Sequence, residues 1–170
     1  AYLRALTDAG LSIDAAAKQL LFNFNIGTNQ FLAIAKLRAA RKLYTRILEA
    51  CGARVDPENG ETGTAMNMHV RTSKRVITAR DPWVNMLRNT VTTFAGAVAG
   101  AQVITVEPFD KALNVADSFS RRIARNTQVI LMEESHLNRV IDPAGGCWFI
   151  ESLTDELTAK AYDIFKDIES

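Results

Sequence analysis

The order of apolar and polar positions along the chain indicates short strands separated by longer helices. Leu21–Ile26 alternates apolar and polar residues with a period of two, which is typical of a half-buried strand. Met66–Arg71 repeats the alternation, with its apolar residues on one face and His69 on the other. Two short apolar runs, Val103–Val106 and Cys147–Ile150, predict two more strands. The chain is therefore expected to contain four strands.

Between the strands, apolar residues recur at intervals of three and four, which predicts amphipathic helices. Residues 1–10 and 15–20 form two short helices, and residues 56–65 form the one long loop. The expected helix starts are Ser12 or Asp14, Thr28, Asp81 with Pro82, Asp117 or Ser118, and Ser152. The expected inward faces of two helices are Trp83, Leu87, Val91, Phe94 and Val98, and then Phe119, Ile123, Thr127, Ile130 and Leu131.

Single strands that alternate with helices of roughly 15–20 residues imply parallel βαβ units with right-handed crossovers. The predicted fold class is therefore α/β, with four βα units and parallel strands. Four such units correspond to half of an eight-stranded barrel or to a small doubly wound sheet. The chain of 170 residues is shorter than the ~200 residues of a minimal closed (β/α)₈ barrel.

Composition excludes several function classes. The chain has 48% apolar and 23% charged residues, and 20 Lys and Arg balance 19 Asp and Glu. This balance does not favour a nucleic-acid partner. Residues 1–10 lack the apolar core of a signal peptide, and the uncharged stretch 89–106 is too polar to span a membrane. We expect a cytoplasmic protein whose two cysteines are reduced and mostly buried.

Candidate chemistry lies after the second predicted strand, because ligands of parallel α/β folds bind at the carboxyl ends of the strands. Two hydroxyls stand among three cations there, and they could hold the phosphates of a ligand such as coenzyme A. A solvated basic turn is the alternative. His69 is either a packing histidine or a residue of a barrel interior. No metal motif is present. The coenzyme A candidates are Arg71, Thr72, Ser73, Lys74 and Arg75.

Four segments in collinear order resemble the cobalamin-dependent methylmalonyl-CoA mutase family. They are Ile34–Arg41, Arg80–Asn85, Arg122–Gln128, and Asp142–Gly146, which reads Asp-Pro-Ala-Gly-Gly. The resemblance implies that residues 1–170 form the C-terminal half of the substrate-binding (β/α)₈ barrel. The family's cobalamin-binding domain carries an Asp-x-His-x-x-Gly signature, which this sequence lacks. The resemblance therefore implies adenosylcobalamin in the holoenzyme but none bound by this chain alone.

Departures from the family's catalytic pattern at three places favour its small, non-catalytic subunit. At one of them, catalytic chains read Gln-Glu-Glu-Ser-Gly and this chain has Met132 for the Gln. Where catalytic chains read Arg-Thr-His-x-Gln-Thr-Ser-Gly, this chain has Asn67 for the Arg, Arg71 for the Gln and Lys74 for the Gly. Where they read Leu-His-Thr-Asn, residues 104–107 read Ile-Thr-Val-Glu, so Thr105 replaces the histidine. These changes imply that the chain has no catalytic residue and that His69 is a remnant.

Three hypotheses follow. The first is a half barrel of the small subunit, which would stabilise the catalytic chain in a heterodimeric enzyme that interconverts methylmalonyl-CoA and succinyl-CoA. The second is a divergent, active acyl-CoA mutase that binds coenzyme A through Arg71–Arg75. The third is an unrelated α/β binding module, because a fold alone does not define a function.

Overall fold

The computed structural model describes residues 1–53, 66–113 and 117–169. Three single-turn 3₁₀ helices, η1, η2 and η3, separate some of the longer elements in these residues. The order is α1 (Tyr2–Asp8), α2 (Ile13–Lys18), β1 (Leu21–Ile26), α3 (Gln30–Ala50), β2 (Asn67–Thr72), η1 (Lys74–Val76), α4 (Val84–Val98), β3 (Val103–Thr105), η2 (Lys111–Leu113), α5 (Ser118–Glu133), η3 (Leu137–Arg139) and α6 (Trp148–Glu169). The loop predicted at residues 56–65 lies outside the described residues.

The described strands form one parallel sheet in the order β1-β2-β3. Leu21 pairs with Asn67 and Ile26 with Thr72, so the first two strands run side by side along their whole length. The shorter β3 pairs with the second half of β2, from His69 onwards. The prediction of an α/β fold with parallel strands is thus confirmed.

The prediction of a fourth strand at Cys147–Ile150 is wrong. Residues 148–150 are the first residues of α6, and the amide of Glu151 donates to the carbonyl of Cys147 at 2.9 Å. The run Cys147–Ile150 was assigned by its apolar character alone, and such a short run does not distinguish a strand from a helix start. Ile150, 5% exposed, belongs to the helical face that packs on α3, and Ser152 lies inside the helix rather than at its start.

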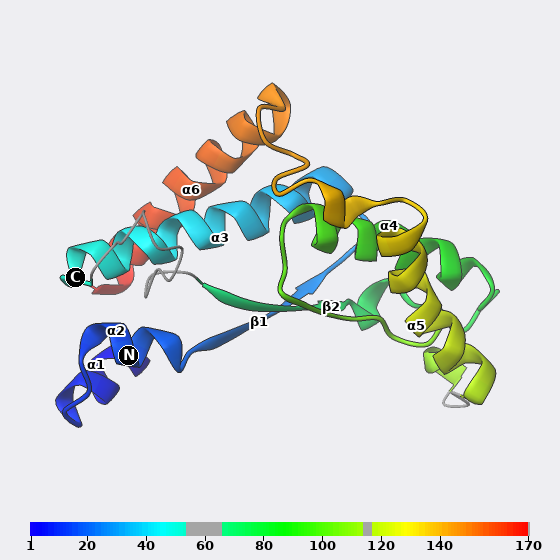
Figure 1. Cartoon of the computed structure of the whole chain (residues 1–170), viewed down its shortest axis with the longest axis horizontal. Coiled ribbons are helices and arrows are strands. Elements are labelled where there is room, and N and C mark those ends of the chain that lie inside the picture. The colour runs from blue at the N-terminus through cyan, green and yellow to red at the C-terminus, as the bar shows by residue number, and fades with distance from the viewer. Residues whose placement is uncertain (54–65, 114–116, 170) are drawn as a thin grey trace.

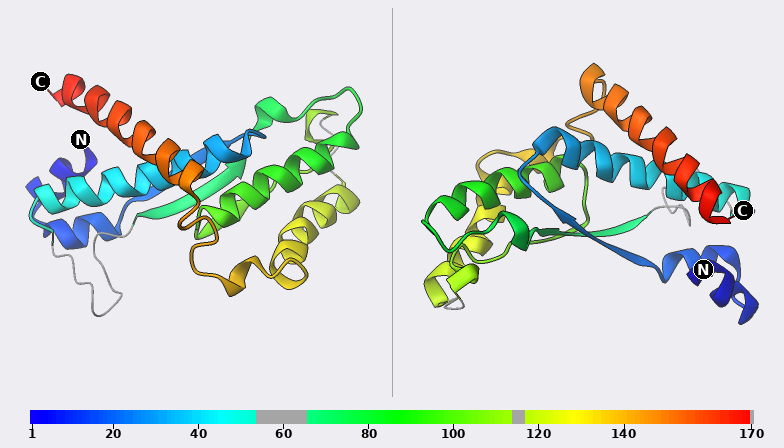
Figure 2. Two further views of the ribbon diagram at one scale, coloured as in Figure 1. Left: turned by 90° about the horizontal axis from the view of Figure 1, so that it is seen from above. Right: turned by 180° about the vertical axis from the view of Figure 1, so that it is seen from behind.

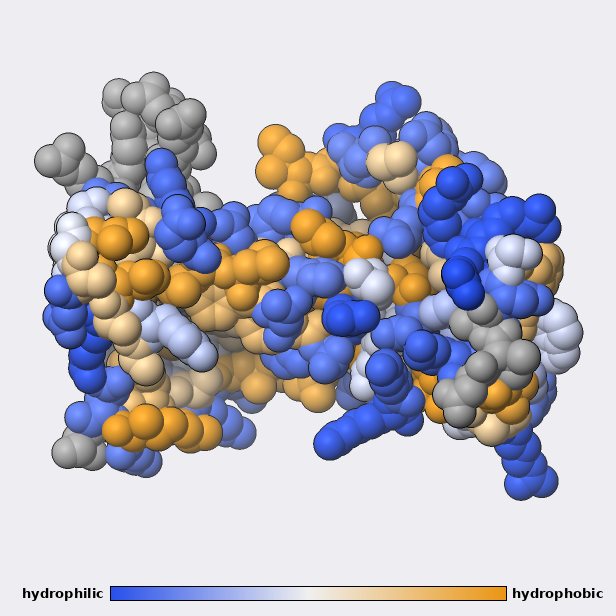
Figure 3. Space-filling model, turned by 90° about the horizontal axis from the view of Figure 1, so that it is seen from below, coloured by the Kyte–Doolittle hydropathy of each residue, from blue (hydrophilic) through white to orange (hydrophobic). Residues whose placement is uncertain are grey.

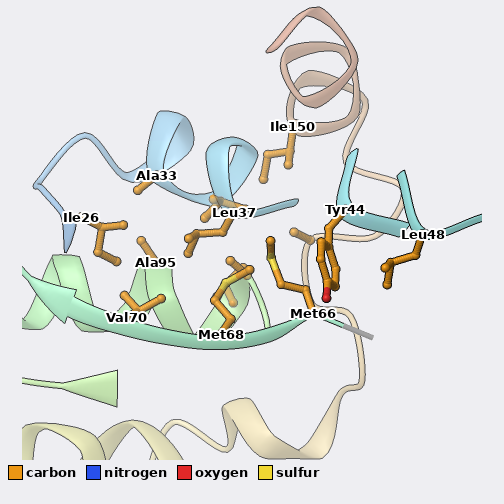
Figure 4. Close-up of a cluster of buried hydrophobic side chains, with 14 of the residues drawn as sticks. Ile26, Ala33, Leu37, Tyr44, Leu48, Met66, Met68, Val70, Ala95 and Ile150 are labelled. Atoms are coloured by element: carbon orange, nitrogen blue, oxygen red, sulfur yellow. The ribbon is translucent and has the colours of Figure 1, made fainter. Parts of the chain in front are cut away.

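Helices α3 and α4 lie along one face of the sheet, and α1 and α2 lie beyond the start of β1 (Figure 1). Helices α3 and α4 pack against each other, α4 also contacts β2 and β3, and α6 lies against α3 on the side away from the strands (Figure 2). Apolar side chains of α3 and of the strands meet in the core between these layers (Figure 4). The buried residues labelled there are Ile26, Ala33, Leu37, Tyr44, Leu48, Met66, Met68, Val70, Ala95 and Ile150.

The first half of helix α4 buries a different face from the predicted one. Trp83 and Leu87 are 58% and 68% exposed, whereas Asn85 and Asn89 are buried. The Nδ2 groups of both asparagines donate to main-chain carbonyls of the segment after β3, which compensates the burial of these two donors, whereas Asn89 Oδ1 is buried without a partner among the described residues. The predicted stripe is therefore right in the second half of the helix, where Val98 is buried and Phe94 packs against the core, and wrong in the first half. The helix also begins later than predicted, because Asp81 has a φ of +54° and is not the cap.

Other local predictions had mixed outcomes. Ser12 caps α2 and Asp117 caps α5 as expected, but Asn29 rather than Thr28 caps α3. Among the predicted inward residues of α5, Leu131 is buried, whereas Phe119 and Ile130 are 41% and 46% exposed. The two cysteines, Cys51 and Cys147, are exposed, which corrects the expectation that they are buried.

Much apolar side-chain surface is exposed, and Figure 3 shows it interspersed with polar residues on the lower side of the molecule. Within the described ranges, no helix has the length and apolar character required to cross a bilayer. The sheet face opposite α3 and α4 carries mostly polar side chains.

Candidate functional site

The alternation of β1 and β2 sorts their side chains onto two faces. Phe22, Phe24 and Ile26 face the helices in β1, as do Met68 and Val70 in β2, and these side chains pack with the core. The intervening residues lie on the opposite face, because successive side chains of a strand alternate. The parallel register pairs Asn23 with His69 and Asn25 with Arg71. A row of polar groups therefore runs across the uncovered face of the sheet.

Two side-chain pairs connect β2 with β3 and the segment that follows it. His69 Nε2 lies 2.8 Å from Thr105 Oγ1, which is a hydrogen bond. Arg71 Nη2 lies 3.4 Å from Glu107 Oε1, so the second pair is a loose ion pair. The imidazole and the guanidinium thus both have partners within this chain.

The carboxyl ends of β1 and β2 enclose a polar cleft of about 710 Å³. Its charged lining consists of three cations from β2 and η1 and one carboxylate, Glu107. The lining residues are Asn23, Asn25, Arg71, Thr72, Ser73, Lys74, Arg75 and Glu107. The cleft therefore contains all five residues that the sequence singled out for a phosphate-bearing ligand.

These five residues differ in how they are held. Thr72 is 1% exposed, and its hydroxyl accepts the amide of Glu107 at 2.8 Å. Ser73 caps η1, because its Oγ accepts the amide of Arg75 at 3.2 Å. Arg71, Lys74 and Arg75 are exposed. The three cations are accordingly the groups most able to meet an anion from solvent, and the hydroxyls mainly fix the backbone around them.

Two buried asparagines of α4, which the sequence motifs did not indicate, hold loops near the cleft, and one of them bonds Glu107 in the cleft wall. Asn89 Nδ2 donates to the carbonyl of Glu107 at 2.7 Å. Asn85 Nδ2 donates to the carbonyls of Thr78 at 2.8 Å and Phe109 at 2.7 Å, and Asn85 Oδ1 accepts the amide of Thr78. The available signal was a pair of asparagines four residues apart, which places both on one helical face.

Two of the four segments that carry the family resemblance meet in a second polar cluster, between α3, α6 and the loop before α6. Arg38 donates to Asp142 at 2.6 Å and to Glu151 at 2.7 Å, and its side chain is 16% exposed. A Cβ at Gly145 would lie 2.9 Å from Asp142 Oδ2, and Gly146 has a φ of +75°. The loop therefore requires both glycines in order to present Asp142 to Arg38.

The charges of this cluster shift one another's pKa values. The hydrogen bond from Arg38 lowers the pKa of Asp142, and the same bond raises the pKa of Arg38. Desolvation by burial lowers the pKa of the neighbouring Arg41, whose Nη2 donates to the carbonyls of Ala99 and Gly100 at 3.0 and 2.9 Å. The cluster ties α3 to the end of α4 and to the start of α6, and we assign it a structural role.

The polar cleft lies at the carboxyl ends of parallel strands, which is where (β/α)₈ barrels and doubly wound sheets bind their ligands. The general class of this protein is therefore an α/β protein with the architecture of such barrels and sheets. Among the described residues, no group of three or more His, Cys, Asp or Glu side chains is arranged to hold a metal ion.

Comparison with known proteins then gives the family. The family model for methylmalonyl-CoA mutase matches residues 1–170, and the chain belongs to this family. It is 55% identical, over 99% of its length, to a methylmalonyl-CoA mutase small subunit of Streptomyces virginiae. It is 42% identical to the small subunit of Porphyromonas gingivalis over 98% of the chain, and 39% identical to the large subunit of that organism over 99%. The chain spans 26%, 26% and 23% of these three relatives.

Proposed function

We propose that this chain is part of the small, supporting subunit of a cytoplasmic methylmalonyl-CoA mutase. The whole enzyme would interconvert methylmalonyl-CoA and succinyl-CoA by a radical shift of the carbon skeleton, with adenosylcobalamin as its cofactor. The partner of the subunit is the catalytic chain, in a heterodimer. We propose neither a nucleic-acid partner nor a membrane partner.

The identity of 55% to a small subunit is the observation that carries this proposal. The polar sheet face supports it. Thr105 stands where the catalytic pattern has a histidine, and its hydroxyl bonds the remaining imidazole, His69. Arg71 stands where that pattern has a glutamine, and it is paired with Glu107. Groups that bond one another are less available to a substrate.

The same pairs argue against a role of this sheet face in holding adenosylcobalamin. His69 is the histidine on the face, and its Nε2 lies within hydrogen-bond distance of Thr105 Oγ1. Lys74 and Arg75, the other charged groups that line the cleft, are cations. A cationic side chain is not a suitable ligand for the metal ion of a macrocycle. We therefore assign the cofactor to another part of the assembly and no step of the reaction to these residues.

Exposed apolar side chains support a role in assembly. Large aromatic side chains bury much apolar area where proteins associate, and they are enriched in such interfaces. Trp83 and Phe109 stack with ring centroids 5.1 Å apart, and Trp83 is 58% exposed. Trp148 is 80% exposed at the start of α6. In the complete enzyme these side chains would be buried against the rest of the subunit and its partner.

The cleft itself favours a second candidate function. Three cations around about 710 Å³ provide room and charge for the phosphates of coenzyme A. In this alternative, the chain belongs to a divergent acyl-CoA mutase and binds coenzyme A through Arg71, Ser73, Lys74 and Arg75, with Thr72 positioning the backbone.

Calorimetric titration of coenzyme A into the complete subunit distinguishes the two functions. The supporting role predicts no binding in the micromolar range, both for the wild type and for an Arg71→Ala variant. Micromolar binding by the wild type that Arg71→Ala abolishes would overturn the supporting role in favour of the alternative. Arg46→Ala, at an exposed arginine of α3 outside the cleft, is the matched control.

A further inference from the structure

Among the described residues, Glu107 is the one carboxylate that lines the cleft, and the fold holds it firmly. The residue is 6% exposed. Its amide donates to Thr72 Oγ1 at 2.8 Å, and its carbonyl accepts from Asn89 Nδ2 at 2.7 Å. Both bonds are made by main-chain atoms and are shielded from water. The position of Glu107 is therefore set by β2 and α4, independently of what its carboxylate contacts.

Arg71 is held much less firmly. Its side chain is 47% exposed, whereas that of Glu107 is 8% exposed. The distance of 3.4 Å between Arg71 Nη2 and Glu107 Oε1 exceeds the 2.7–2.9 Å typical of charge-assisted hydrogen bonds. By comparison, the two ion pairs of Arg38 in the same molecule are shorter, at 2.6 and 2.7 Å. The contact with Glu107 is therefore loose on the arginine side, whereas the main chain fixes the glutamate beside Arg71.

The substitutions relative to the family's catalytic pattern coincide at this pair. The resemblance given above implies glutamine at the position of Arg71 and asparagine at the position of Glu107 in catalytic chains. Two neutral amides are thus replaced by two opposite charges, and the charges face each other. A fixed carboxylate next to Arg71 lowers the favourable potential that the three cations create for an incoming anion.

We infer that Glu107 competes with phosphate-bearing ligands for Arg71. By pairing with Arg71, it keeps such ligands from binding to Arg71, Lys74 and Arg75. The inference rests on the proposed supporting function and names the residue that makes the cleft inactive. The ligand class that it excludes is an organic di- or polyphosphate, which needs several cations at once.

The experiment neutralises Glu107 in the complete subunit assembled with its catalytic partner. Glu107→Gln removes the charge and leaves the two main-chain hydrogen bonds of residue 107 in place. Glu107→Asn provides a second neutral variant if the first folds poorly. The probes are pyrophosphate and coenzyme A, and the readout is the dissociation constant by calorimetry, together with its dependence on salt. Glu133→Gln, at an exposed glutamate of α5, changes the net charge equally.

We expect Glu107→Gln to bind pyrophosphate at least tenfold more tightly than the wild type, with a steeper salt dependence. Arg71→Ala in the Glu107→Gln background should abolish the gain, and Glu133→Gln should show none. Equal binding, or no binding, by the wild type and both neutral variants would overturn the inference and leave the supporting function intact. Micromolar binding of coenzyme A by the wild type would instead overturn the supporting function.

Discussion

Replacing Arg38 by alanine tests whether the cluster of Arg38, Asp142 and Glu151 ties α6 to α3. The substitution removes two close ion pairs, at 2.6 and 2.7 Å, and a side chain that is only 16% exposed. It leaves two carboxylates that are 49% and 42% exposed and can be rehydrated. The large loss of stability that follows when a buried charge is left without a partner therefore does not apply in full.

The magnitude follows from these exposures. Ion pairs with exposed partners contribute roughly 0.2–1 kcal/mol each, and the shielded arginine places these two near the upper end. Loss of the packed aliphatic stem of Arg38 adds about 1 kcal/mol. The local free energy of opening at the start of α6 should fall by about 3 kcal/mol, which corresponds to roughly 150-fold faster exchange of its protected amides.

Hydrogen–deuterium exchange of residues 148–155 in the complete subunit measures this loss. The pH dependence has a defined sign, because Arg38 lowers the pKa of Asp142. The contribution of Asp142 is fully present above its unfolded pKa of about 3.9 and is lost as pH falls through the lower folded value. The difference between wild type and Arg38→Ala should thus shrink at acid pH.

Arg46→Ala is the control, since Arg46 lies on the same helix but is 73% exposed and forms an ion pair with Glu49 on that helix. It should change the exchange of α6 by less than about twofold. If Arg38→Ala changed exchange no more than Arg46→Ala, the structural role of the cluster would be refuted.

Three further predictions concern the interior, a helix terminus and the sheet edges. Asn85→Ala should destabilise the protein by about 2–3 kcal/mol, measured by thermal unfolding, because it removes the donor to the buried carbonyl of Phe109 and to the part-buried carbonyl of Thr78; an unchanged midpoint would contradict this. The amide of Ser120 lowers the pKa of Asp117, so the start of α5 should lose protection as pH falls through that pKa, and Asp117→Asn should flatten the dependence. Residues 1–170 expressed alone should associate through the free edges of β1 and β3, and light scattering that gives a monomer would count against it.

The sequence predicted those parts of the fold whose patterns are local. Leu21–Ile26 was predicted with its observed bounds because an alternation of period two has few other interpretations. Cys147–Ile150 was misassigned because four apolar residues fit a strand or the first turn of a helix equally well. The outcome there depends on packing against α3, which is distant in sequence.

The candidate site was predictable in composition but not in arrangement. Arg71–Arg75 could be identified because they follow a strand, and the cleft contains all of them. The pairing of Arg71 with Glu107 could not be predicted, since it depends on the register of β2 with β3. The burial of Asn85 and Asn89 could not be predicted either, because the carbonyls that compensate it belong to loops whose positions only the tertiary structure defines.

The central claim is that this chain supports a catalytic partner and takes no part in the reaction. The turnover number of the reconstituted heterodimer with His69→Ala in the present chain tests it most directly. The account predicts a kcat within about twofold of wild type, because His69 bonds Thr105 within the sheet face. A fall of kcat by a factor of about 10²–10⁴, the range expected for loss of a general acid or base, would contradict it.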